Sequence, residues 1–107
     1  MTYRTIILRR ARQDIARIHG WIAKRSPTGA ERWFQALEDA IELLRRDAAA
    51  YPLTDEAAHV GMAIRHVLFH TRRGNKYRVV FIIFGDEVRV LRVRGTGQRR
   101  LRSRDVI

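Results

Sequence analysis

The sequence has no cysteine, only two prolines, and no long apolar run in its 107 residues. The absence of cysteine excludes a disulfide scaffold and a zinc site built on thiolates. The apolar patch Ile6–Leu8 is too short for a secretory signal peptide, and no segment approaches the roughly 18 apolar residues of a membrane span. We therefore expect a cytoplasmic protein that works without a membrane and needs no covalent cross-link.

Acidic residues and lysine are also scarce. The chain has 11 acidic residues against 22 basic ones, for a formal net charge of +11; only Lys24 and Lys76 are lysine, so 20 of the basic residues are arginine. The excess is +4 over residues 1–53 and +7 over residues 54–107. The planar guanidinium group of arginine suits phosphates and carboxylates. The composition therefore predicts an anionic partner.

The apolar spacing of the first half predicts a strand and then two helices. Residues 2–10 alternate as a strand does, whereas the next apolar residues recur at steps of three and four. The first helix is predicted over 11–25 and ends at Ser26-Pro27, where Ser26 suits the cap and Pro27 the first turn of a second helix over 27–48. The two apolar stripes are Ala11, Ile15, Ile18 and Ile22, and then Phe34, Leu37, Ile41 and Leu44.

The second half has the pattern of a loop and three strands. Residues 49–62 lack either period and contain Pro52 and Gly61, which predicts a loop. Turn residues at 72–75 and at Gly85-Asp86 separate the strand-like runs, so neighbouring strands should be antiparallel. The predicted strands cover residues 63–70, 76–84 and 87–94.

Alternation within these strands predicts where they lie. Residues 77–84 are apolar on both faces apart from Arg78, as in a central strand covered on both sides. The change of parity near Leu91 indicates a β-bulge. No assignment is made for residues 95–107, which are rich in charge and glycine. The order β-α-α-β-β-β predicts one α+β domain over residues 1–107, an antiparallel sheet packed against a helical hairpin.

An ordered set of short motifs resembles the RelE/ParE superfamily of toxins from bacterial type II toxin-antitoxin modules, also called plasmid stabilisation proteins. The likeness covers nearly the whole chain. The matching segments are Ile22–Pro27, Ala30–Phe34, Pro52, Ile64-Arg65, Lys76–Phe81 and Gly85–Arg94.

The resemblance implies a small basic toxin that a cognate antitoxin neutralises. RelE-like members cleave messenger RNA in the ribosomal A site, whereas ParE-like members poison DNA gyrase without a recognised catalytic centre. The branch therefore decides whether the protein is an enzyme. An acidic antitoxin segment would fold along the helical hairpin or add to a sheet edge.

RNA cleavage needs a proton acceptor, a proton donor and positive charge over the phosphate. If the chain is RelE-like, Arg65, Arg78 and Arg99 or Arg100 are its candidate phosphate-stabilising residues. Arginine serves only this third need, because it stays protonated. RelE-like members often carry a C-terminal tyrosine or histidine, and residues 98–107 contain neither.

Histidine is the remaining source of proton transfer. Alternation places His66 and His70 on the strand face opposite Arg65, and an ordinary sheet histidine is the alternative interpretation of each. The sequence has no spacing typical of a metal site and no cofactor-binding motif, so we expect no metal, cofactor or small-molecule substrate.

We accordingly predict a ParE-like toxin directed at DNA gyrase, with an acidic antitoxin as its partner. One alternative is a RelE-like endoribonuclease that acts on ribosome-bound message. The other is a basic nucleic-acid-binding module without toxicity, since a charge of +11 alone favours salt-sensitive binding to polyanions.

Overall fold

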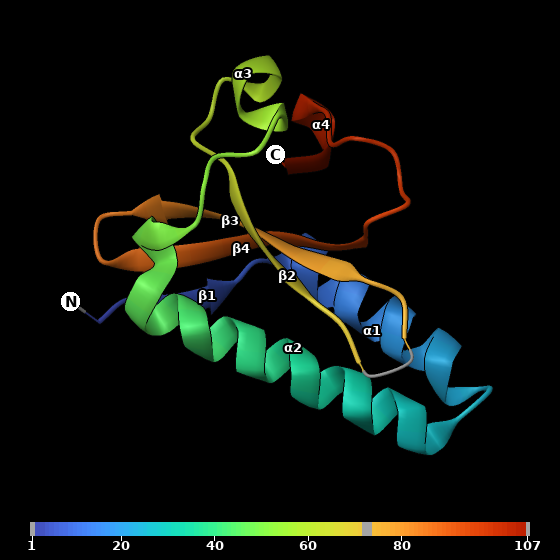
Figure 1. Ribbon diagram of the computed structural model, residues 1–107. Helices are drawn as coiled ribbons and strands as arrows, with labels where there is room; N and C mark the ends of the chain where they lie inside the picture. The colour runs from blue at the N-terminus through green and yellow to red at the C-terminus, as the bar shows by residue number, and fades with distance from the viewer. Residues whose placement is uncertain (1, 72–73, 107) are drawn as a thin grey trace.

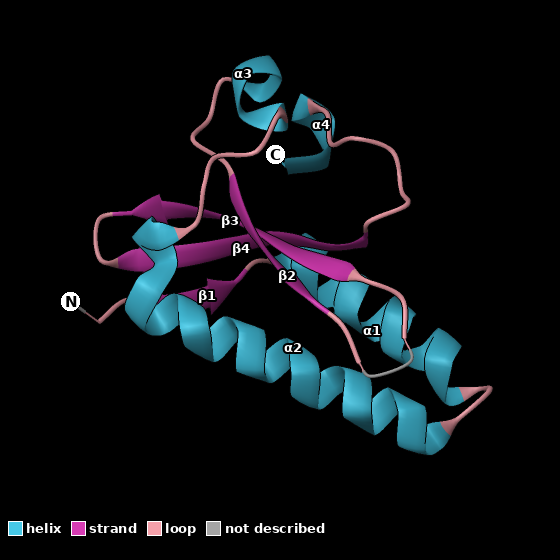
Figure 2. Cartoon of the chain, in the orientation of Figure 1, coloured by secondary structure: helices cyan, strands magenta, loops and turns pink. Residues whose placement is uncertain are grey.

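The computed structural model describes residues 2–71 and 74–106. The predicted helices and strands follow one another in the predicted order, with short helices in addition (Figure 2). No helix in these two ranges is long and apolar enough to cross a membrane. The elements are β1 (Arg4–Ile7), α1 (Arg9–Ala23), α2 (Pro27–Asp47), a 3₁₀ turn η1 (Ala48–Ala50), α3 (Glu56–Val60), β2 (Arg65–Phe69), β3 (Tyr77–Phe84), β4 (Glu87–Gly95) and α4 (Ser103–Val106).

The four strands form one sheet in the order β1-β4-β3-β2. The β2–β3 and β3–β4 pairs are antiparallel, which confirms the α+β class and the inner position of β3. The fourth strand differs from the predicted antiparallel sheet: β1 runs parallel to β4. A parallel pair needs a long crossover connection, and the helical hairpin with β2 and β3 supplies one.

The hairpin of α1 and α2 covers one face of the sheet (Figure 1). Its main core joins apolar side chains of both helices to those of β2, β3 and β4. The stripe of α2 differs from the expected one: Trp33 is 2% exposed, whereas Phe34 is 41% exposed. The buried positions of α2 are Ala30, Trp33, Leu37, Ala40 and Leu44.

The opposite face is covered by α3 and α4, which lie above the sheet in Figure 1. A second apolar cluster joins them to it through Ile64, Val80, Leu91 and Leu101. The prediction that residues 49–62 form a loop is therefore wrong in part, because they contain the end of η1 and the whole of α3. A helix of five residues has too few turns to show a helical period.

The predicted irregularities of the sheet are largely confirmed. Val80 pairs with Arg92 but Phe81 pairs with Val90, so Leu91 is the extra residue of a bulge. Gly85 has φ of 62° in the turn between β3 and β4, where glycine carries no steric cost. In the predicted turn at 72–75, Arg72 and Arg73 lie outside the described residues.

Two boundaries shift by a few residues. The first strand is shorter than 2–10, and α1 begins at Arg9 and ends at Ala23 rather than spanning 11–25. The start of α2 is as predicted: Ser26 Oγ accepts a hydrogen bond of 2.9 Å from the backbone N–H of Gly29, and Pro27 occupies the first helical position.

Replacing Ser26 tests its assignment as the N-cap of α2. Ser26→Ala should lower the free energy of unfolding by about 1 kcal/mol, because it leaves a backbone N–H of the first turn without its acceptor. Thr28→Ala, within the same exposed turn, is the control and should cause no comparable loss. Urea denaturation followed by circular dichroism measures both, and equal effects would contradict the assigned cap.

Candidate functional site: an arginine face paired with carboxylates

The face of the sheet opposite the helical hairpin carries a group of basic side chains. The β2–β3 and β3–β4 registers put His66, Arg78, Arg92 and Arg94 on this side, since directly paired residues share a face. The bulge at Leu91 puts both Arg92 and Arg94 on this side of the sheet, opposite Val90. We call these four residues the arginine face.

Arg78 is held by a buried carboxylate. Its two terminal nitrogens donate to the two oxygens of Glu56 on α3, at 2.5 and 2.7 Å. Glu56 is 3% exposed and also accepts from the backbone N–H of Leu101. Burial alone would raise the pKa of Glu56, but the hydrogen bonds from Arg78 and Leu101 outweigh it and lower that pKa. The pair therefore stays ionised and joins α3 and the C-terminal segment to β3.

Arg92 is held in the same way by α1. Its Nε and Nη2 donate to Asp14 at 2.7 and 2.9 Å, and the hydrogen bond with Asp14 raises the pKa of Arg92 despite its burial. Asp14 is 3% exposed and accepts a further 3.0 Å bond from the backbone N–H of Val93. Because β1 pairs with β4 only as far as Val90, Asp14 occupies the edge of β4 beyond the end of β1.

The third carboxylate belongs to α4. Arg99 donates to both oxygens of Asp105 at 2.8 and 3.0 Å, and the backbone N–H of Arg102 adds a bond of 2.7 Å. The hydrogen bonds from Arg99 lower the pKa of Asp105 far below its ordinary range and raise that of Arg99. Asp105 thereby links Arg99 and Arg102 to α4 within the C-terminal segment.

Arg94 has no such partner among the described residues. It is 6% exposed, its one hydrogen bond runs from Nη2 to the carbonyl of Arg99, and its Nε is buried without an acceptor. Burial, followed by the charges of Arg92 and Arg99, lowers the pKa of Arg94. The arginine face therefore retains positive charge that its carboxylates do not balance.

The three arginines singled out from the sequence do not form one cluster. Arg78 lies on the arginine face, whereas Arg65 pairs with Phe81 of the main core, lies on the opposite face and donates to the carbonyl of Tyr51. Arg99 lies beyond β4 and pairs with Asp105. Arg100, the alternative to Arg99, is exposed and 3.7 Å from Asp55. Their role in phosphate binding stays a prediction for the RelE-like alternative.

His66 lies beside Arg78, next to its ion pair with Glu56. Its Nδ1 is 3.2 Å from Arg78 Nη1, and both residues line a cavity of about 480 Å³ with Glu56. Burial, with the charge of Arg78, lowers the pKa of His66. His66 lies on the face opposite Arg65, as alternation predicts. No group of three His, Cys, Asp or Glu residues in the described ranges has the geometry to hold a metal ion.

The carboxylates that organise this site escaped the sequence analysis. One signal was present: Asp14 lies three residues after Ala11 and four before Ile18, which is a position on the buried stripe of α1. A lone acidic residue at that spacing indicates a buried partner. Glu56 and Asp105 lie in segments whose structure was not predicted, so no pattern distinguished them from surface acids.

Comparison with known proteins places this architecture in a class. A structure described as "Chromosomal ParDE TA system from P. aeruginosa" superposes with a TM-score of 0.70 over 88% of this chain and 96% of that chain, at 18% sequence identity. This likeness is one of fold. Comparison with curated protein sequences gave no match. Together with the family match over residues 6–100, this likeness shows the fold of the RelE/ParE superfamily of type II toxins.

The family model of the ParE toxin of the type II toxin-antitoxin system parDE matches residues 6–100. The chain therefore belongs to the ParE toxin family, and an antitoxin is its expected protein partner.

Removing the charge of Glu56 tests how much the arginine face depends on its carboxylates. Glu56→Gln should lower the free energy of unfolding by about 3 kcal/mol, because it leaves Arg78 charged and buried without its counter-ion. Asp55→Asn is the matched control, since Asp55 is an exposed neighbour, and should change stability by less than about 0.5 kcal/mol. Chemical denaturation measures both variants. Similar losses in the free energy of unfolding would show that the buried pair stabilises the protein no more than an exposed carboxylate does.

The lowered pKa values of three groups predict that the free energy of unfolding decreases as the pH is lowered. His66 ordinarily titrates near 6.5, and its lowered pKa means that the unfolded chain binds the proton first, so stability decreases as pH falls below 6.5. Glu56 and Asp105 have lowered pKa values, so their contribution is present above their ordinary values of 4.5 and 3.8 and is lost below them.

Thermal unfolding between pH 7.5 and 3.5 checks this sign. His66→Gln should flatten the decline just below pH 6.5 and leave the steeper loss at lower pH. The exposed His59 supplies the control, because His59→Gln should leave the whole profile unchanged. A profile of the same shape for His66→Gln and the parent would contradict the assignment.

Proposed function

We propose that the protein inhibits bacterial growth by binding DNA gyrase through protein contacts, and that an acidic antitoxin neutralises it. Membership of the ParE toxin family supports a toxin of this branch. The observation that carries the proposal is the internal pairing of the arginines that a nuclease would need.

That pairing works against a phosphate. Both terminal nitrogens of Arg78 already donate to Glu56 at 2.5 and 2.7 Å. A phosphate approaching Arg78 would meet the charge of this carboxylate and would have to displace it from a buried ion pair. Arg65 and Arg99 also donate to acceptors within the chain. The described part of the C-terminal segment, residues 96–106, offers no tyrosine or histidine for proton transfer.

The acidic character of the antitoxin follows from charge. A net charge of +11 on 107 residues favours an anionic partner and fast association with it. An antitoxin segment that carries carboxylates would lower the charge of the complex and fold on binding.

One observation favours the RelE-like alternative as a second candidate. His66 has a lowered pKa, so it is neutral near pH 7, and it lies 3.2 Å from Arg78 at a cavity of about 480 Å³. A neutral imidazole beside a guanidinium has the composition of a site that accepts a proton and holds a phosphate.

Induction of the protein alone, with pulse-labelling of DNA and protein synthesis, distinguishes the two candidates. We expect DNA synthesis to stop first and purified gyrase to lose supercoiling activity in proportion to added toxin. Early loss of protein synthesis with cleavage of ribosome-bound message would instead establish the RelE-like activity. Harmless expression at a high level would contradict both and favour the basic nucleic-acid-binding module.

His66→Gln supplies the internal control for this experiment. A ribonuclease that uses His66 for proton transfer should lose about 10²- to 10⁴-fold in cleavage rate. A toxin that acts by contact with gyrase needs no such group. Arg78→Ala is a poorer probe, because it would leave Glu56 buried without its counter-ion and impair folding.

A further inference from the structure

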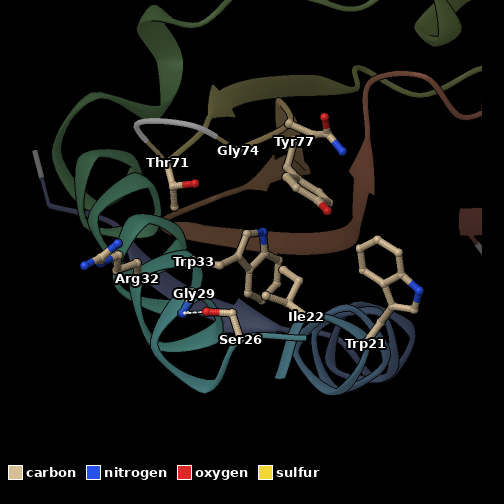
Figure 3. A pocket seen from close by; sticks show the side chains of 10 residues that line it. Trp21, Ile22, Ser26, Gly29, Arg32, Trp33, Thr71, Gly74 and Tyr77 are labelled. Atoms are coloured by element: carbon tan, nitrogen blue, oxygen red, sulfur yellow. Dashed lines mark hydrogen bonds between the residues drawn. The ribbon is translucent and has the colours of Figure 1, made fainter. Parts of the chain in front are cut away.

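A second cavity lies at the far end of the molecule from α3 and α4, where the turn between α1 and α2 faces the start of β3 (Figure 3). Its volume is about 580 Å³, within the range of sites that enclose a ligand. Its floor combines Ile22, Trp33 and Tyr77, and Trp21 stands at its side. None of the described residues that line it is acidic.

The floor contains a hydrogen-bond donor with nothing to bind. Trp33 is 2% exposed, and its Nε1 has no acceptor among residues 2–71 and 74–106. The neighbouring rings of Phe69 and Tyr77, at centroid distances of 5.9 and 5.6 Å, offer it no oxygen or nitrogen. In Figure 3 this nitrogen points toward the side of the cavity formed by Gly74 and Tyr77. A buried N–H is almost always paired in folded proteins, so the cavity has a place for an acceptor.

The rim is positive. Arg32 lines the cavity, is exposed, and has no carboxylate within ion-pair distance in residues 2–71 and 74–106. Arg25 is equally without an acidic partner there, and its guanidinium lies over the Trp21 ring at 4.1 Å from the centroid. An occupant that carries negative charge would complement both arginines.

We propose that this cavity binds an acidic peptide segment with one apolar anchor side chain, and that it is a docking site for the antitoxin. The apolar side chain fills the space between Ile22, Trp33 and Tyr77. A backbone carbonyl of the segment accepts from Trp33 Nε1, and a flanking carboxylate pairs with Arg32. This assignment rests on the proposed function only for the identity of the partner that supplies the segment.

A peptide fits these features better than a nucleic acid does. Stacking of bases needs a free aromatic face, and one face of the Trp21 ring carries the Arg25 guanidinium. The single buried donor matches a backbone carbonyl, which a peptide presents at every residue. A phosphate backbone has no apolar group that would fill the apolar floor of the cavity.

The cavity can be followed directly, because Trp21 and Trp33, which both line it, are the two tryptophans of the chain. Titration of the full chain with the acetylated, amidated peptide Asp-Glu-Leu-Asp-Glu should change the tryptophan fluorescence in a saturable manner. Arg32→Gln should weaken the affinity about tenfold, the effect of losing one charged hydrogen bond. Arg46→Gln removes the same charge from an exposed position near the other end of α2 and should retain parental affinity apart from the general loss of charge.

Trp33→Phe removes the donor and keeps an aromatic ring, and Trp21 then reports binding alone. The affinity of this variant for the acidic peptide should fall about tenfold, while its circular dichroism spectrum stays unchanged. If the variant unfolds, the comparison of Arg32→Gln with Arg46→Gln tests the proposal instead. Equal affinity of Arg32→Gln and Arg46→Gln would overturn the proposal. The proposal would also be overturned if the peptide Lys-Lys-Leu-Lys-Lys bound with the same affinity as Asp-Glu-Leu-Asp-Glu. Displacement of the acidic peptide by oligothymidylate, weakened by Arg32→Gln in the same way, would overturn it as well.

The two proposals fail separately in these experiments. Peptide binding uses the purified toxin and needs no gyrase, whereas growth arrest and gyrase inhibition use the toxin without any peptide. Growth arrest with no saturable fluorescence change would overturn the docking site alone. Fluorescence changes as expected without growth arrest would overturn the toxin mechanism and keep the peptide site.

Discussion

Buried pairing between carboxylates and arginines is the constraint on which the arginine face and the elements around it depend. Asp14 and Glu56 are each 3% exposed and each meets an arginine of the sheet in two hydrogen bonds. Burying either partner alone would be expensive, but as pairs with additional backbone donors they are fully satisfied. Each carboxylate also accepts from a backbone N–H, of Val93 or of Leu101, so each pair fixes the path of the main chain as well as a side chain.

The division of charge between the inside and the outside of the molecule has functional meaning. On the arginine face, Arg78 and Arg92 are neutralised within the chain. At the helical turn, Arg25 and Arg32 point outward beside apolar surface. The first arrangement stabilises the fold, and the second leaves two positive charges beside exposed apolar surface.

Periodicity over long segments predicted most of the fold. The two helices, the central position of β3 and the bulge near Leu91 all follow from spacing that extends over eight or more residues, whereas the cap at Ser26 follows from the chemistry of Ser26-Pro27. The short helices α3 and α4 have five and four residues, which is too few for a period to emerge. The parallel β1–β4 pair depends on which strand lies beside which, a property that local spacing does not encode.

The site was less accessible to sequence analysis, because pairing between charges depends on tertiary neighbours. Arg65 and Arg78 look alike along the chain, yet alternation puts them on opposite faces. The apolar stripe of α2 was right at Leu37 and Leu44, but Trp33 is buried where Phe34 was expected inside. The burial of Trp33 places its indole at the cavity floor.

The extra residue at Leu91 has a consequence for chain length. Val90 and Leu91 are both buried, on opposite faces, and if Leu91 stood in a regular ladder without the bulge, the residues after it would exchange sides. Arg92 and Arg94 would then enter the apolar interior beneath the helices, and Val93 would lie among charges. A relative that lacks the codon of Leu91 keeps the faces of the following residues in a regular strand, so an alignment of such a relative through β4 must admit a single-residue gap at this point.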